Sequence, residues 1–129
     1  MSTKGEDIAE RLLELAAFVL RIGSTLRKNG APRKVIVQLQ SSGTSGGANY
    51  EEARGAESRK DFVHKVRVSL KEVRETRYWL RLVVRAGFLP ATDEVAEKID
   101  EAEQLVAILT ASCRTATANL ERSKRSSPA

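Results

Sequence analysis

Residues 58–87 have the sequence SRKDFVHKVRVSLKEVRETRYWLRLVVRAG, and this stretch decides the fold class. Its apolar residues recur every three or four positions, which is the period of a helix with one buried face. Ser58, followed three residues later by Asp61, is a variant of the capping box that begins a helix, and Gly87 and Pro90 end it. We therefore predict a helix over residues 58–86. Its expected buried face consists of Phe62, Val66, Ser69, Val73, Leu80 and Val84, widened by Trp79 and Val83.

The helical period continues on both sides of this stretch. A first helix is predicted from near Glu6 to Lys28, because Gly30 suits a left-handed cap. A last helix is predicted from the N-cap Thr92 to about residue 122. Short connections join the helices, so consecutive helices should be antiparallel neighbours. The predicted fold is all-α, an antiparallel up-down-up-down four-helix bundle in a single domain, residues 1–122. Residues 123–129 lack apolar anchors and are expected to form a disordered C-terminal tail.

The second helix is ambiguous in sequence. It should begin after Pro32, but residues 41–47, SSGTSGG, have the composition of a flexible linker. The other interpretation is a continuous helix whose small residues let a neighbouring backbone come close. The helical pattern of residues 50–54, YEEAR, slightly favours continuity.

Composition excludes several classes of protein. The 129 residues are 41% hydrophobic and 30% charged, which is typical of a globular chain and not of a disordered one. The single cysteine, Cys113, excludes an intramolecular disulfide and a cysteine cluster for zinc. No signal peptide or membrane span is evident in the sequence, and we therefore expect a cytoplasmic protein.

The positive charge is concentrated in the middle of the chain. Residues 31–90 carry twelve basic and six acidic groups, whereas residues 91–129 carry five basic and seven acidic groups. At about 100° per residue, six cations of the third predicted helix lie within about 40° of one line, with Tyr78 among them. We call these six residues the basic stripe: Lys60, Arg67, Lys71, Arg74, Arg81 and Arg85.

Three interpretations of the basic stripe remain open. It could bind the phosphate backbone of a nucleic acid, for which guanidinium groups are well suited. It could be a solvated face compensated by Glu75 or by acids of the last helix. It could instead pair with that acidic helix across a subunit interface. No helix-turn-helix, zinc finger or aromatic platform is evident, so any binding should depend only weakly on sequence.

No set of residues predicts catalysis. His64 is the only histidine and is expected at the surface, while Cys113 falls on an apolar helical face and is expected to be packed. Asn49 is expected to bond a backbone group or a neighbouring helix. The acidic pairs Glu51-Glu52 and Glu72/Glu75 have no histidine partner at the spacing of a di-metal bundle. We expect no enzyme activity, no catalytic residue, no metal and no cofactor.

Several motifs of the central region together resemble one family. In order, they are QL at 38–39, SS at 41–42, ANYEEA at 48–53, AESRKDF at 56–62, SLKE at 69–72 and ETRYWLRL at 75–82. They resemble the S23 family of four-helix bundles, encoded in intervening sequences within bacterial 23S rRNA genes. The resemblance implies a ring, commonly a pentamer, with no established catalytic residue. It also favours a continuous second helix, although Gly43, Gly46 and Gly47 replace larger residues of the family pattern.

The functional expectation combines the stripe with the resemblance. A related branch of the family supplies accessory proteins to diversity-generating reverse transcriptases, and these bind the enzyme and nucleic acid. We therefore expect a homo-oligomeric accessory protein that binds RNA or DNA, and the resemblance implies that the oligomer is a pentamer. The alternative is a structural oligomer that recruits a protein partner, such as a reverse transcriptase. Apolar residues on more than one face of the third helix, namely Tyr78, Trp79, Leu82 and Phe88, fit either a subunit contact or a wider core stripe.

Overall fold

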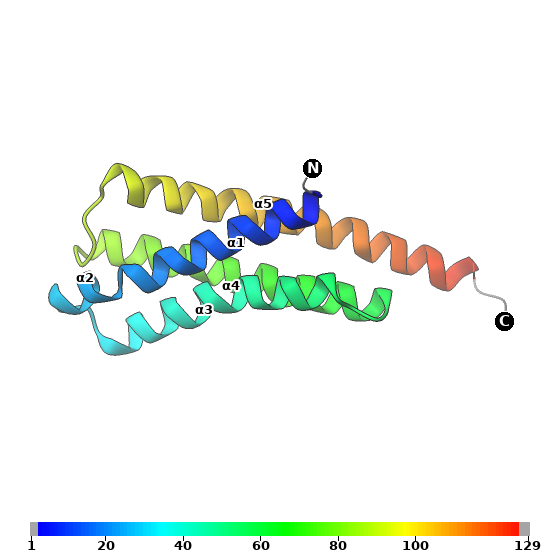
Figure 1. The fold of residues 1–129 in the computed structure, drawn as a ribbon, viewed down its shortest axis with the longest axis horizontal. Helices are drawn as coiled ribbons and strands as arrows, with labels where there is room; N and C mark the ends of the chain where they lie inside the picture. Colours follow the sequence, from blue (N-terminus) through cyan, green and yellow to red (C-terminus); the bar gives the residue numbers. More distant parts are fainter. Residues whose placement is uncertain (1–2, 127–129) are drawn as a thin grey trace.

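The computed structural model describes residues 3–126, and this part of the chain is built from helices and short connections. The helices are α1 (Lys4–Arg21), α2 (Gly23–Lys28), α3 (Arg33–Arg54), α4 (Arg59–Arg85) and α5 (Asp93–Ser126). Because α2 follows α1 after a single residue, the two together form one arm of an antiparallel four-helix bundle (Figure 1). The predicted fold class is confirmed.

The predicted helix ends are confirmed, except at the end of α5. Ser58 caps α4 by accepting a 3.1 Å hydrogen bond from the Asp61 amide, and Thr92 accepts one from Val95 at the start of α5. Gly30 and Gly87 adopt φ of 82° and 84° after their helices, which side-chain-bearing residues rarely do. Helix α5 continues to Ser126, so residues 123–126 of the expected tail are helical here, and residues 127–129 lie outside the described part.

The first arm is not the single helix that the sequence predicts. The helix is interrupted at Ile22, between α1 and α2. At this break the Gln40 side chain of α3 donates a 3.3 Å hydrogen bond to the carbonyl oxygen of Val19. A Cβ on Gly23 would lie 2.5 Å from the same Gln40 amide, so glycine leaves the space that this contact needs. A residue of another helix therefore bonds the backbone at the interruption.

Helix α3 runs without a break through residues 41–47, which rejects the linker interpretation. Its small residues face two neighbours. A Cβ on Gly43 would lie 2.4 Å from Val19 Cγ2 of α1, and one on Gly46 would lie 2.8 Å from Val73 Cγ2 of α4. The glycines therefore allow both neighbouring helices to pack closely against α3, which compensates for their weak helix propensity.

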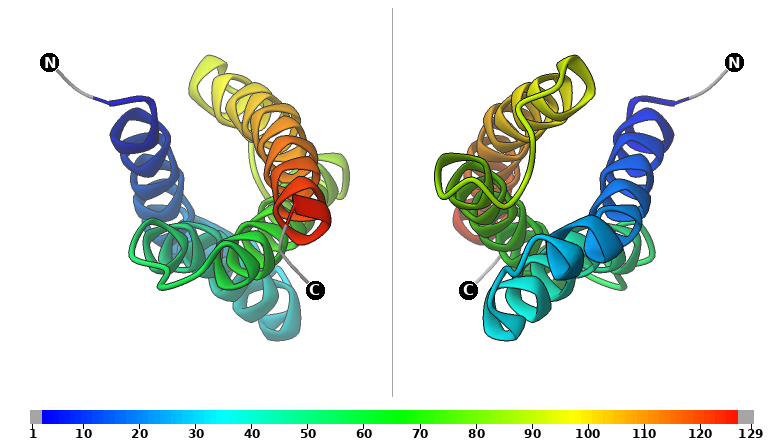
Figure 2. Two further views of the ribbon diagram at one scale, coloured as in Figure 1. Left: turned by 90° about the vertical axis from the view of Figure 1, so that its right-hand side faces the viewer. Right: turned by 90° about the vertical axis from the view of Figure 1, so that its left-hand side faces the viewer.

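The arrangement of the arms is visible along the bundle axis (Figure 2). Helices α3 and α4 lie side by side as the base, while α1 packs on α3 and α5 packs on α4. Contacts between α1 and α5 are fewer and include a bidentate ion pair of Arg11 with Glu101. The core contains fully buried side chains from each long helix, including Phe18, Leu39, Leu80 and Leu105.

Candidate nucleic-acid interface

Helix α4 separates its apolar and cationic residues onto different faces. Its buried residues are Val63, Val66, Ser69, Val73, Thr76, Leu80 and Val83. Phe62, Trp79 and Val84, which the sequence assigns to the same face, are only partly buried against this core. All six residues of the basic stripe are exposed, as the helical rotation predicts. The stripe extends from Lys60 to Arg85, a rise of about 38 Å along the helix, slightly more than one turn of a DNA duplex.

The stripe is not neutralised within the described residues. The ion pairs found in residues 3–126 involve Arg11, Arg54, Lys65 and Arg77, and none involves a stripe residue. Arg67 donates a 3.1 Å hydrogen bond to the hydroxyl of Thr117 on α5, which is a neutral partner. The solvated-face interpretation included compensation of the stripe by carboxylates of the same chain. No carboxylate forms an ion pair with the stripe in this part of the chain.

The acids expected to compensate the stripe have other partners. Glu75 accepts a 3.1 Å hydrogen bond from the indole Nε1 of Trp79. Glu103 of α5 lies 3.9 Å from Arg77, which is outside the stripe. Tyr78 is 58% exposed among the stripe cations and meets Trp79 edge-on, with 5.1 Å between ring centroids. Within residues 3–126, the six cations of the stripe are therefore exposed without an ion pair, and one exposed aromatic ring lies among them.

Other candidate residues lie where catalysis is not favoured. His64 is exposed, and Cys113 is buried, where desolvation raises the pKa of its thiol although Arg67 and Arg74 partly oppose this. A raised pKa leaves the thiol protonated and weakly nucleophilic at neutral pH. Asn49 donates to the Ser45 carbonyl and hydroxyl within its own helix, not to a neighbouring helix. Residues 3–126 contain no cluster of three or more metal-ligating side chains.

Most of the exposed large apolar side chains belong to α1 and α3, not to α4. Leu13 and Leu20 of α1 are 59% and 55% exposed, and Val37 of α3 is 51% exposed. A groove of about 630 Å³ runs between α1 and α3, with Leu13, Ala16 and Ala48 in its lining. The sequence carried one signal for this flank, because Leu13 and Leu20 are seven residues apart and outside the main apolar stripe. Trp79, in contrast, is partly buried against the core.

Within residues 3–126, no helix combines the length and the apolar character that a membrane crossing requires. Residues 6–111 match the model of the family described as 23S rRNA-intervening sequence protein. The chain belongs to this family.

A solved member of the family has the same fold. It is a protein of unknown function from the S23 ribosomal protein family of Bacteroides thetaiotaomicron, solved at 1.70 Å. Its TM-score to this chain is 0.78 at 28% sequence identity, and the match covers 87% of this chain and 99% of that one. No curated protein matches the chain. The family resemblance predicted from the central motifs is thus confirmed, and it extends into the first and last helices.

Proposed function

We propose that this 23S rRNA-intervening sequence protein is a non-enzymatic cytoplasmic oligomer that binds the backbone of RNA or DNA through its basic stripe. The single observation that carries the proposal is that all six stripe cations are exposed and without ion pairs within residues 3–126. Like charges on one helix face repel each other by a few tenths of a kcal/mol per pair. A polyanion removes this repulsion and releases its own counterions on binding.

Assembly into a ring, a pentamer by the resemblance, is part of the proposal. Each subunit would contribute one stripe, and several weak phosphate contacts on one strand would act together. The exposed Leu13, Leu20 and Val37 support a subunit contact on the flank formed by α1 and α3, because burial between subunits would remove these apolar side chains from water. This flank is separate from the stripe, so assembly and binding would not compete.

The experiment compares two triple variants with the same loss of charge. Lys71→Gln/Arg74→Gln/Arg81→Gln removes half of the stripe, whereas Arg21→Gln/Arg33→Gln/Lys34→Gln removes three exposed cations from other helices. Binding of labelled RNA and DNA is followed by fluorescence anisotropy, with circular dichroism to verify folding. We expect at least tenfold weaker binding for the stripe variant and a much smaller change for the control. Equal losses for both variants would reject the stripe as the binding face.

A second function is favoured by the α1/α3 groove. Its floor of small residues, the exposed Leu13 and the flanking charged residues Glu6, Glu10, Glu51 and Arg54 also suit an amphipathic helix of another protein. In this alternative the oligomer recruits a protein partner, such as a reverse transcriptase of a diversity-generating retroelement, and does not itself bind nucleic acid. Co-purification with the neighbouring gene product, combined with absence of any anisotropy change with RNA or DNA, would favour this alternative.

A further inference from the structure

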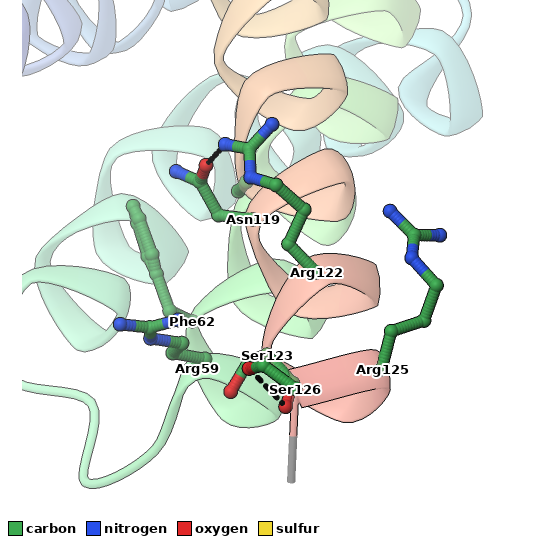
Figure 3. Close-up of a pocket in the computed structure, with 8 residues that line it drawn as sticks. Arg59, Phe62, Asn119, Arg122, Ser123, Arg125 and Ser126 are labelled. Carbon is green, nitrogen blue, oxygen red and sulfur yellow. Dashed lines mark hydrogen bonds between the residues drawn. The ribbon is translucent and has the colours of Figure 1, made fainter.

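A hollow of about 980 Å³ lies at the end of the bundle, where α4 begins and α5 ends (Figure 3). It forms because α5 has 34 residues and α4 has 27, so the last turns of α5 have few neighbours. Arg59 and Phe62 contribute to the lining from α4, and Asn119, Arg122 and Arg125 contribute from α5. This volume is within the range of about 300–1,000 Å³ that small-molecule sites occupy.

The lining of this hollow is cationic. It contains three arginines and no carboxylate, and none of the three arginines is in an ion pair within residues 3–126. Arg122 donates a hydrogen bond to the side-chain oxygen of Asn119, which directs its guanidinium group along α5 (Figure 3). The hollow is therefore a positive pocket with one arginine already oriented.

The helix dipole explains only part of the positive charge in this hollow. Arg122 and Arg125 are near the C-terminus of α5, where the helix dipole favours cations. Arg59 is the first residue of α4, where the same dipole disfavours a cation. Its position adds positive charge to an end that is already positive. An anion held between Arg59 and Arg122 would offset this excess positive charge at the start of α4.

The residues also indicate the kind of anion. Guanidinium groups bind phosphate through paired hydrogen bonds, and the N-terminal end of a helix adds favourable potential for it. Phe62 is half-buried and offers a ring face within the same lining, next to the Asn119 amide. A flat base could stack on such a ring, and an amide could bond its edge. Phosphate and base together describe a nucleotide.

We propose that this pocket binds a nucleoside phosphate, with the phosphate between Arg59 and Arg122 and the base against Phe62. The ligand is either a free nucleotide or the phosphorylated terminal nucleotide of a strand. The proposal does not rest on the basic stripe, because no stripe residue lines the pocket. A failure of backbone binding at the stripe therefore leaves the pocket untouched.

The test is calorimetric titration of the full chain with adenosine 5′-monophosphate, adenosine and inorganic phosphate. We expect the nucleotide to bind at least about tenfold more tightly than either of the other two compounds. Arg59→Gln and Arg122→Gln should each weaken nucleotide binding about tenfold or more. The matched control is Arg33→Gln, because Arg33 is likewise the exposed first residue of a helix, and it should leave binding unchanged.

Three results would overturn the pocket proposal: equal affinity for nucleotide and adenosine, equal affinity for nucleotide and phosphate, or equal losses in Arg59→Gln and Arg33→Gln. Phe62→Leu provides a further check, since it should reduce the preference for nucleotide over inorganic phosphate. A second arm compares oligonucleotides with a 5′-phosphate and a 5′-hydroxyl. A preference for the phosphate that is lost in Arg59→Gln assigns the pocket to strand ends, and no preference assigns it to free nucleotides.

Discussion

The hydroxyl of Ser69 on α4 donates a 2.7 Å hydrogen bond to the main-chain carbonyl oxygen of Gly46 on α3. Ser69 is fully buried, and Gly46 is also buried. Two turns further along α4 and one turn back along α3, the Thr76 hydroxyl donates to the Ser42 hydroxyl at 3.0 Å. A side chain can reach the backbone of a neighbouring helix in this way only where that helix presents small residues. Ser42 and Gly46 of α3 are therefore packing residues at the α3–α4 contact.

Adding a methyl group where α3 packs closely against α4 or α1 should destabilise the bundle. Gly46→Ala places a Cβ 2.8 Å from Val73 Cγ2, and Gly43→Ala places one 2.4 Å from Val19 Cγ2. Either helix must then move, and we expect a loss of about 1–3 kcal/mol in the free energy of unfolding. Denaturant titration measures it. Gly5→Ala is the control, because its Cβ would meet its nearest neighbour at 3.7 Å; unchanged stability in Gly43→Ala and Gly46→Ala would contradict the close packing.

The contact between α1 and α5 should weaken in acid. Arg11 donates to both carboxylate oxygens of Glu101, at 2.9 and 2.6 Å, and these bonds hold the pKa of Glu101 below its usual value. The stabilisation is present at neutral pH and is lost as pH falls through the lowered pKa of Glu101. A double-mutant cycle with Arg11→Met and Glu101→Gln should give a coupling of about 1 kcal/mol at neutral pH. A coupling that persists at pH values well below the usual carboxyl pKa would contradict this pairing.

The contribution of Glu72 to stability should have the opposite pH dependence. Burial raises its pKa first, and the charge of Glu75 raises it further. A raised carboxyl pKa means that the ionised form opposes folding, so its cost grows as pH rises through that pKa. Glu72→Gln should therefore raise the thermal midpoint at neutral pH by a small amount and leave it unchanged in acid. Lower stability of Glu72→Gln at neutral pH would show that the carboxylate has a stabilising partner.

The exposed leucines of α1 should be needed for assembly. Leu13→Gln/Leu20→Gln changes two side chains that are 59% and 55% exposed, so the monomer fold should keep its stability. If the α1/α3 flank is the subunit contact, multi-angle light scattering should give a lower mass for this variant. Tyr78→Gln, which alters an exposed side chain on α4, is the control and should keep the wild-type mass. Equal masses for all three proteins would place the contact elsewhere.

Local signals in the sequence were sufficient for most of the fold. Ser58, Gly30 and Gly87 act at helix ends through contacts within a few residues, so their roles follow from composition and spacing. The course of residues 41–47 did not follow from propensity, because the helix depends on close packing with Val19 and Val73. The break at Ile22 involves the Gln40 amide, which is far along the chain. Contacts of this kind become visible only in three dimensions.

The candidate sites also include features that follow from the sequence and features that depend on contacts between distant residues. Exposure of the basic stripe follows from helical rotation alone, since opposite faces of α4 differ in polarity. The absence of carboxylate partners for the stripe in residues 3–126 could not be predicted, because it depends on which acids of α5 reach α4. The arginine pocket was missed because Arg59 and Arg122 are distant in sequence and line one hollow only in the folded chain, where α4 begins beside the end of α5.

Salt dependence tests the central claim most directly. The logarithm of the association constant with a DNA duplex should fall linearly with the logarithm of salt concentration. For Lys71→Gln/Arg74→Gln/Arg81→Gln the slope should be smaller by about 2 to 3 while the light-scattering mass stays unchanged. Arg21→Gln/Arg33→Gln/Lys34→Gln should keep the wild-type slope. Wild-type affinity that does not change with salt, or a stripe variant that keeps the full slope, would contradict backbone binding by the basic stripe.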